Sequence, residues 1–266
     1  MRYGIVGALV AAAFYTLVPP HHLHRSGAGL LRQGTSWSWH GRLAAGKAIE
    51  IRGVSGSISA QAASGNEVEV TAEKHGRRSD PDDVTIEVVE HDGGVTICAV
   101  YPGSNNRCAP GGGQMNTRNN DVEVEFTVHV PRDVGFVGAT VNGGVEAVGL
   151  SGPVEASTVN DGIHIETSAG DVRASTVNGS ITAVATGAGT RPLRFNTVNG
   201  SITVTLPRNL SADVEAATVN GTITTDFPIT VDGRMSPRRL RGRIGQGGRS
   251  LELETVNGSI RIRSAM

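Results

Sequence analysis

Apolar and polar residues alternate with a period of two along much of this chain, which is typical of β-strands that bury one face. The clearest run ends at Pro131, and its apolar members are Val122, Val124, Phe126, Val128 and Val130. Residues 84–90 and 95–101 are two further strand-like segments. They flank His91-Asp92-Gly93-Gly94, which predicts a β-hairpin. We therefore expect residues 48–131 to form an N-terminal β region.

From residue 138 onward the alternating segments become short, and a glycine-containing turn follows about every nine residues. Val154, Ala156 and Thr158 would share one face, and after Gly162 the parity shifts so that Ile163 continues the same face. Two short strands and two tight corners then make one unit. The pattern predicts an all-β fold, a single-stranded β-solenoid with about 18–21 residues per coil. Only five Phe, three Tyr and two Trp are available, so we expect a thin core of small and β-branched side chains.

The four-residue phrase Thr-Val-Asn-Gly recurs six times, once with an aspartate inserted before the glycine. Its asparagines are spaced by 18, 18, 21, 21 and 37 residues. We interpret the phrase as a corner of each coil, in which glycine supplies unusual backbone angles. The predicted corner residues are Asn142, Gly143, Asn160, Gly162, Asn178, Gly179, Asn199, Gly200, Asn220, Gly221, Asn257 and Gly258. Coils stacked about 4.8 Å apart would align the asparagines in a hydrogen-bonded ladder.

Two orientations of this phrase are compatible with the sequence. In the one we favour, the threonines and asparagines face inward. In its rival the valines face inward, and the threonines and asparagines form an outer polar array. A function in binding ice or another crystalline surface depends on this rival orientation, because it needs outward columns of threonine.

The pattern also divides the chain. Residues 1–24 have a charged start and an apolar stretch, so we expect a signal peptide or a membrane anchor there. Residues 25–47 are expected to be a linker or entry segment, and residues 132–266 the repeat solenoid. Within that solenoid, residues 251–263 contain the last copy of the phrase, which we expect to form the final coil.

Cys98 and Cys108 lie on either side of a Pro-, Gly- and Asn-containing segment. In an exported protein, two such cysteines most simply form one disulfide. Together with the leader, they predict an extracytoplasmic location in the periplasm, envelope or cell surface.

The charge balance, 24 basic against 25 acidic residues, offers no electrostatic argument for nucleic acid. We expect no catalytic residues, metal or cofactor, because the acidic residues of the repeat fall at non-equivalent positions and no calcium-repeat or nucleophile motif occurs. A basic segment interrupts the repeat. We interpret it as a solvated loop that could bind a partner, with Arg234, Arg238, Arg239, Arg241 and Arg243 as its arginines.

The repeated phrases resemble those of a bacterial family of adhesin-like proteins of unknown function. The resemblance covers roughly residues 48–263. It includes an early copy at residues 55–58, central copies at 176–181 and 197–202, and a closing stretch from 245 to 260. It implies an extracytoplasmic β-solenoid with a surface or adhesive role. We expect a module without enzymatic activity that binds an envelope protein, a glycan or a cell-wall polymer. The alternative is a carbohydrate-active enzyme on a β-helix scaffold, with active residues from 92–121 and 232–249.

Overall fold

The computed structural model describes residues 34–113, 115–187, 189–231 and 236–265. The chain divides into two units, Met1–Leu31 and Arg32–Met266, and all the described residues lie in the second. The predicted leader at 1–24 is therefore outside the described residues, as is the first part of the predicted linker. No helix in the described ranges is both long enough and apolar enough to cross a membrane.

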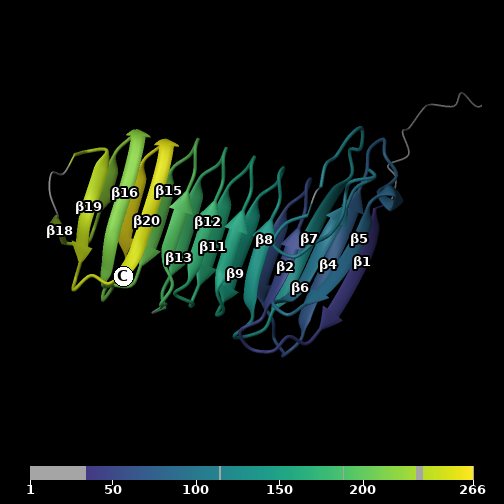
Figure 1. Ribbon diagram of the computed structural model, residues 1–266, viewed down its shortest axis with the longest axis horizontal. Coiled ribbons are helices and arrows are strands. Elements are labelled where there is room, and N and C mark those ends of the chain that lie inside the picture. Colours follow the sequence, from purple (N-terminus) through teal and green to yellow (C-terminus); the bar gives the residue numbers. More distant parts are fainter. Residues whose placement is uncertain (1–33, 114, 188, 232–235, 266) are drawn as a thin grey trace, which may run out of the picture. The chain divides into compact units, whose positions relative to one another are not determined.

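Two β-sheets lie face to face and enclose one apolar core (Figure 1). In spatial order, the first sheet contains β1 (Thr35–Gly41), β4 (Val68–His75), β7 (Glu123–Val130), β3 (Ile58–Ala62), β9 (Val145–Leu150), β11 (Ile163–Thr167), β13 (Ile181–Ala185), β15 (Ile202–Leu206), β21 (Ile260–Ser264) and β17 (Ile223–Thr225). The second contains β18 (Ile229–Val231), β19 (Arg239–Ile244), β16 (Ala212–Asn220), β20 (Arg249–Asn257), β14 (Leu193–Asn196), β12 (Val172–Ser175), β10 (Val154–Ser157), β8 (Gly135–Ala139), β2 (Ala48–Arg52), β6 (Gly94–Val100) and β5 (Thr85–His91). One short 3-10 helix, η1 (Pro81–Asp83), precedes β5. This architecture confirms the predicted all-β solenoid.

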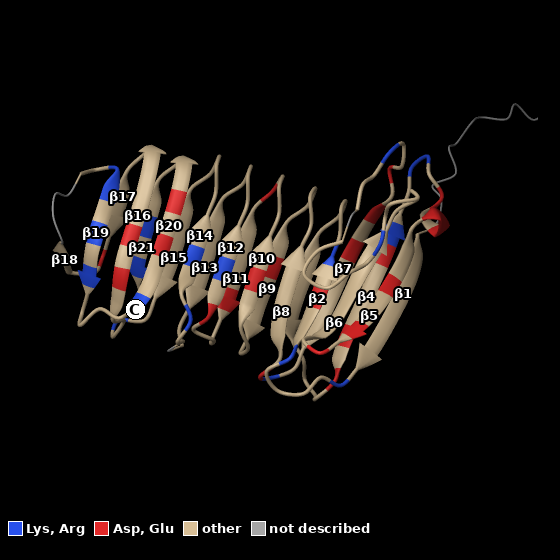
Figure 2. Cartoon of the chain, in the orientation of Figure 1, with Lys and Arg blue, Asp and Glu red and all other residues tan. Residues whose placement is uncertain are grey.

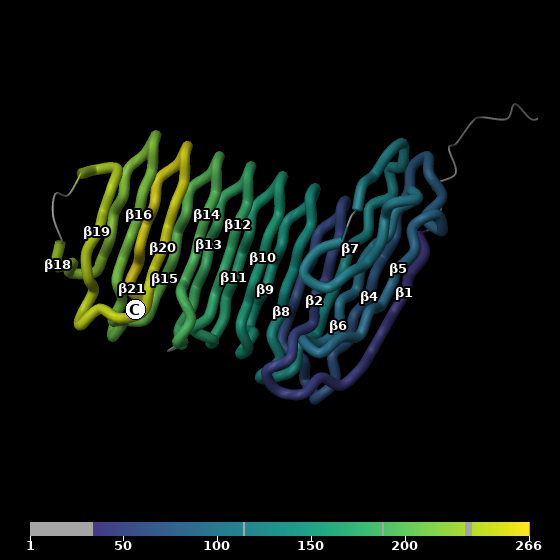
Figure 3. Tube along the Cα trace, viewed as in Figure 1, coloured from purple at the N-terminus to yellow at the C-terminus, as the bar shows by residue number. Residues whose placement is uncertain are grey.

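Each repeat unit contributes one strand to each sheet, and the units stack in parallel (Figure 3). Val154 pairs with Val172 on one sheet and Ile163 pairs with Ile181 on the other, both 18 residues apart. The longer units keep this register because their extra residues lie in turns. For example, β13 ends at Ala185 and β14 begins at Leu193, whereas in the preceding 18-residue unit β11 ends at Thr167 and β12 begins at Val172. The predicted coil length of 18–21 residues is therefore confirmed.

The N-terminal region shares both sheets with the repeat. Strands β2 and β3 form a coil that pairs in parallel with β8 and β9. Ser55 occupies the asparagine position of that coil and bridges to Asn142. Beyond this coil, β6 and β7 also run parallel to it, while β5, β4 and β1 add antiparallel strands. Part of the predicted linker is thus β1, whose Trp37 and Trp39 pack against the core.

The closing copy of the phrase does not form the terminal coil. Strands β20 and β21 insert between the β14–β15 coil and the β16–β17 coil, so the stacking order departs from chain order. The expectation that residues 251–263 end the solenoid is wrong. After β17 the chain forms β18 and β19, and β19 pairs antiparallel with β16 on the side that a further coil would need.

Candidate functional site

The threonine of each corner faces the core. Thr197 is 5% exposed, and its hydroxyl donates a hydrogen bond of 2.8 Å to the carbonyl oxygen of Gly179 in the neighbouring coil. All six copies repeat this contact across coils: Thr140 to Gly56, Thr158 to Gly143, Thr176 to Asp161, Thr197 to Gly179, Thr255 to Gly200 and Thr218 to Gly258. The threonines therefore satisfy corner carbonyls that cannot join the strand ladders. The inward orientation that we favoured is correct for threonine.

The asparagine of each corner faces solvent, which contradicts the prediction that it points inward. The alternation ends at the threonine, because the chain turns there and both following side chains point outward. The amide ladder itself is present. Asn199 donates to Asn178 and accepts from Asn257, each at 2.8 Å. In space the column runs from Asn142 through residues 160, 178, 199 and 257 to Asn220.

The glycine of the corner is required by close packing between coils more than by backbone angles. A Cβ on Gly200 would lie 1.9 Å from the carbonyl oxygen of Gly179, and one on Gly258 would lie 2.0 Å from that of Gly200. Of the predicted corner glycines, Gly143 alone has a positive φ below 160°. In the second copy, Asp161 occupies the position next to the asparagine and Gly162 follows it. The predicted role of glycine is thus corrected.

The valines of the corner form an exposed apolar column, so the rival orientation with inward valines is wrong. Five of the six are exposed, with fractions from 36% at Val159 to 56% at Val219, whereas Val141 is half-buried and packs against the core. Five of the six exposed large apolar residues in the described ranges belong to this column: Val159, Val177, Val198, Val256 and Val219. Because the threonines are buried, the ice-binding hypothesis loses the outward threonine column that it needs.

A groove of about 660 Å³ lies beside the valine column. We call it the corner groove. It crosses β12, β14, β20 and β16, and its lining includes Val177, Val198, Val256 and Val219 from the valine column. The opposite lining comes from the same four strands, two residues before each valine, with Ser175, Asn196, Glu254 and Ala217. Arg238 and Arg239 also line it, beside β16 at its end.

Three of the predicted arginines lie on a strand, and the expectation of a loop is wrong for them. Residues 239–244 form β19, on which Arg239, Arg241 and Arg243 face outward and alternate with buried residues. Arg241 pairs in register with Glu215, and Arg243 with Asp213, across the antiparallel ladder. Arg238 lies in the turn before β19, and Arg234 lies outside the described residues. Figure 2 shows the basic residues of β19 beside the acidic residues of β16.

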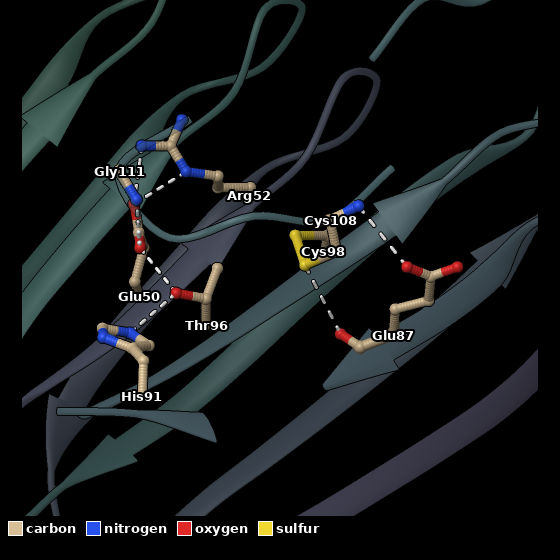
Figure 4. Close-up of a disulfide and its surroundings, with 8 residues drawn as sticks. All are labelled: Glu50, Arg52, Glu87, His91, Thr96, Cys98, Cys108 and Gly111. Carbon is tan, nitrogen blue, oxygen red and sulfur yellow. Dashed lines mark hydrogen bonds and ion pairs between the residues drawn. A yellow bond between two sulfur atoms is a disulfide. The ribbon is translucent and has the colours of Figure 1, made fainter. Parts of the chain in front are cut away.

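A second polar cluster, which sequence reasoning did not find, lies on the outer face of β2 and β6 (Figure 4). Glu50 is 6% exposed, and it forms an ion pair of 2.6 Å with Arg52. Burial raises the pKa of Glu50, but hydrogen bonds from Thr96, the Gly111 N–H and Arg52 outweigh this effect and leave the pKa lowered. Glu50 and Arg52 therefore neutralise each other. The hydrogen bond from the Gly111 N–H to Glu50 anchors the loop that carries Gly111.

The predicted disulfide fastens the same loop to β6. Cys98 and Cys108 are bonded, with their Cα atoms 5.6 Å apart. Tyr101 begins the loop, and its hydroxyl donates to the carbonyl of Val122 at 2.8 Å. Burial raises the pKa of Tyr101 to about 12. The disulfide is confirmed, and these contacts show that the segment after β6 is held closely on the N-terminal part of the fold.

The two segments that the enzyme hypothesis needs are not brought together. Residues 92–121 follow β5, which is the last strand at one end of the second sheet. The described part of 232–249 contains β19, which lies next to the opposite end of that sheet. Separately, Glu73, His75 and Glu125 are exposed and place ligand atoms within 4.8 Å of one another on β4 and β7. Nothing else about this trio indicates a bound ion.

The fold defines the class of protein: a two-sheet parallel β-solenoid with antiparallel strands added at both ends. Residues 139–263 match the model of the family described as Toastrack DUF4097. The match confirms the resemblance that the repeated phrases indicated. Comparison with curated proteins returns no match.

Three solved structures align with most of the chain. A candidate cell adhesion protein from Clostridium sporogenes ATCC 15579 is 12% identical, with a TM-score of 0.48, over 88% of this chain and 100% of its own. A candidate adhesin from Bacteroides fragilis NCTC 9343 is 11% identical, with a TM-score of 0.26, over 87% and 97%. A candidate adhesin from Parabacteroides distasonis ATCC 8503 is 13% identical, with a TM-score of 0.21, over 87% and 98%.

Proposed function

We propose that the protein is a non-enzymatic, adhesin-like module of the cell envelope or cell surface that binds an extended partner. The observation that carries this proposal is the corner groove, which crosses four stacked coils and has an exposed apolar column on one wall. Stacked coils present equivalent groups at a constant spacing, and repeat proteins commonly use such extended surfaces for binding. A partner that is itself extended would contact several coils at once.

The disulfide supports an extracytoplasmic location. Disulfides persist in oxidising compartments and are rare where thiols are kept reduced. The bond between Cys98 and Cys108 joins a loop to a core strand, so we assign it a structural role. The apolar leader predicted at 1–24 would provide the export signal or the anchor.

Cell fractionation combined with mass measurement of the purified protein tests this proposal. We expect the protein in the envelope or outside the cell, with a mass lower by two hydrogens than that of the fully reduced chain. Purified protein should also sediment with an isolated envelope fraction. A cytoplasmic location with reduced cysteines, or no association with envelope material, would overturn the proposal.

A turnover assay separates this proposal from the enzyme alternative. Purified protein is incubated with polysaccharides, and new reducing ends are measured for the wild type and for Arg238→Ala. We expect binding without release of products. Product formation that disappears in Arg238→Ala would instead establish an enzyme.

A further inference from the structure

The two walls of the corner groove differ in chemistry. The valine wall offers methyl groups at successive coils, about 4.8 Å apart, so its four members span about 14 Å. The opposite wall carries the hydroxyl of Ser175, the amide of Asn196 and the carboxylate of Glu254. None of these three side chains forms a hydrogen bond or ion pair within the described part of the chain. The groove therefore presents one apolar side and one side with free polar groups.

Two arginines, Arg238 and Arg239, line one end of the corner groove. The side chains of Arg238 and Arg239 form no hydrogen bond or ion pair with any described residue. Arg239 pairs in register with Ala217, whose other neighbour is Glu254, so the arginine and the acid are two strands apart. That separation is about 10 Å between backbones, and the two side chains form no ion pair with each other. An anionic group of a ligand is a fitting partner for these guanidinium groups.

We propose, building on the proposed function, that the corner groove binds a linear glycan that carries carboxylate groups at intervals. A sugar chain has apolar C–H faces and hydroxyl edges, which match the two walls. A carboxylate on the chain accepts hydrogen bonds from Arg238 and Arg239, and arginine can make two parallel bonds to such a group. Glu254 accepts hydrogen bonds from sugar hydroxyls, and it repels a polymer that has a negative charge on every unit.

An extended peptide fits this groove less well than a glycan. Peptides commonly bind β-sheets by adding a strand to a free edge. Here β12, β14, β20 and β16 are each hydrogen-bonded to a strand on both sides, so they offer no free edge. The groove also runs across these strands, whereas an added strand would lie along them. Recognition in the groove must therefore come from side chains.

The test compares two glycans that share a backbone. One probe is peptide-free glycan strands of peptidoglycan, in which every second sugar carries a lactyl carboxylate. The other is chito-oligosaccharide of matched length, which has the same β-1,4-linked N-acetylglucosamine backbone without carboxylates. Binding to the whole purified protein is measured by calorimetry. We expect at least tenfold tighter binding of the carboxylated strands, and an affinity that falls as salt is added.

Two variants on β19 make a matched pair. Arg239 and Arg241 both face outward, but only Arg239 lines the groove. Arg239→Ala should weaken binding of the carboxylated strands at least tenfold, whereas Arg241→Ala should change it less than twofold. Circular dichroism verifies that both variants keep their strands. A third variant, Glu254→Gln, should allow a polyuronate to bind that the wild type rejects.

Each contrary result has a distinct meaning. Equal affinity for the two glycans would overturn the role of the carboxylate, and equal effects of Arg239→Ala and Arg241→Ala would overturn the assignment to this groove. If neither glycan binds while the protein still sediments with envelope material, the glycan inference fails and the proposed function stands. If envelope association is also lacking, the proposed function fails as well.

Discussion

Replacing Thr197 with valine tests the corner most directly, because it removes one hydroxyl and keeps the shape of the side chain. The hydroxyl of Thr197 donates to the carbonyl of Gly179 at 2.8 Å, and the side chain is 5% exposed. Among the loop and turn hydrogen bonds of the described residues, no backbone N–H donates to that carbonyl. The substitution therefore leaves an acceptor in the corner without its partner.

The magnitude follows from two opposing terms. A buried acceptor that loses its donor costs about 1–3 kcal/mol. The added methyl group of valine recovers about 0.8 kcal/mol through burial of apolar surface. We therefore expect Thr197→Val to lower the free energy of unfolding by about 0.2–2.2 kcal/mol, with a central value near 1 kcal/mol. Because stacked coils contact only their neighbours, this loss should be largely independent of the N-terminal strands.

Urea denaturation followed by far-UV circular dichroism measures this loss. Thr182→Val is the matched control, since Thr182 is exposed on β13 and has no side-chain hydrogen bond among the described residues. It should shift the free energy of unfolding by less than about 0.5 kcal/mol. No loss of stability in Thr197→Val, or an equal loss in both variants, would refute the role of the buried threonine hydroxyl.

Three further predictions use the same denaturation assay. Gly200→Ala should cost more than about 2 kcal/mol because its Cβ would lie 1.9 Å from the carbonyl oxygen of Gly179, whereas Gly65→Ala, with no atom within 4 Å, should be nearly neutral; equal losses would contradict the close-packing argument. Asn199→Ala should cost less than about 1 kcal/mol, since water can replace both exposed amide bonds, and a larger loss than in Thr197→Val would show that the ladder dominates the corner. Tyr101, with its pKa raised to about 12, favours folding fully below pH 10, and this contribution of roughly 2–3 kcal/mol should be lost between pH 10 and 12; an unchanged pH profile in Tyr101→Phe would exclude this cause.

The number of residues per coil could be predicted because equivalent residues recur at a constant spacing in the sequence. Alternation predicts strands, recurring glycines predict corners, and an 18-residue step places equivalent residues on neighbouring coils. The disulfide was predictable for a similar reason, since two cysteines ten positions apart across a turn can reach each other. These features depend on residues that are close together in the sequence, so long-range contacts do not change them.

The orientation of the corner could not be predicted in full. Val154, Ala156 and Thr158 alternate inward as expected, but the next two side chains, at Val159 and Asn160, both point outward. Period-two reasoning fails at a corner because the backbone turns there. A sequence signal was nevertheless available for β19, where arginines alternate with Leu240, Gly242 and Ile244. The high arginine and glycine content of that segment suggested a loop and concealed the strand.

The composition of the corner groove depends on the order in which the coils stack. The repeat spacing in the sequence does not reveal that order. Any copy of the phrase can dock on any other, because each offers a threonine donor, a corner carbonyl and an amide in the same positions. Asn257 therefore fits between Asn199 and Asn220 although it follows both in the chain. This insertion brings Glu254 and Val256 into the middle of the corner groove. If the coils stacked in chain order, Ala217 would lie next to Asn196. Glu254, whose charge limits the negative charge that a bound glycan can carry, would then lie outside the middle of the groove.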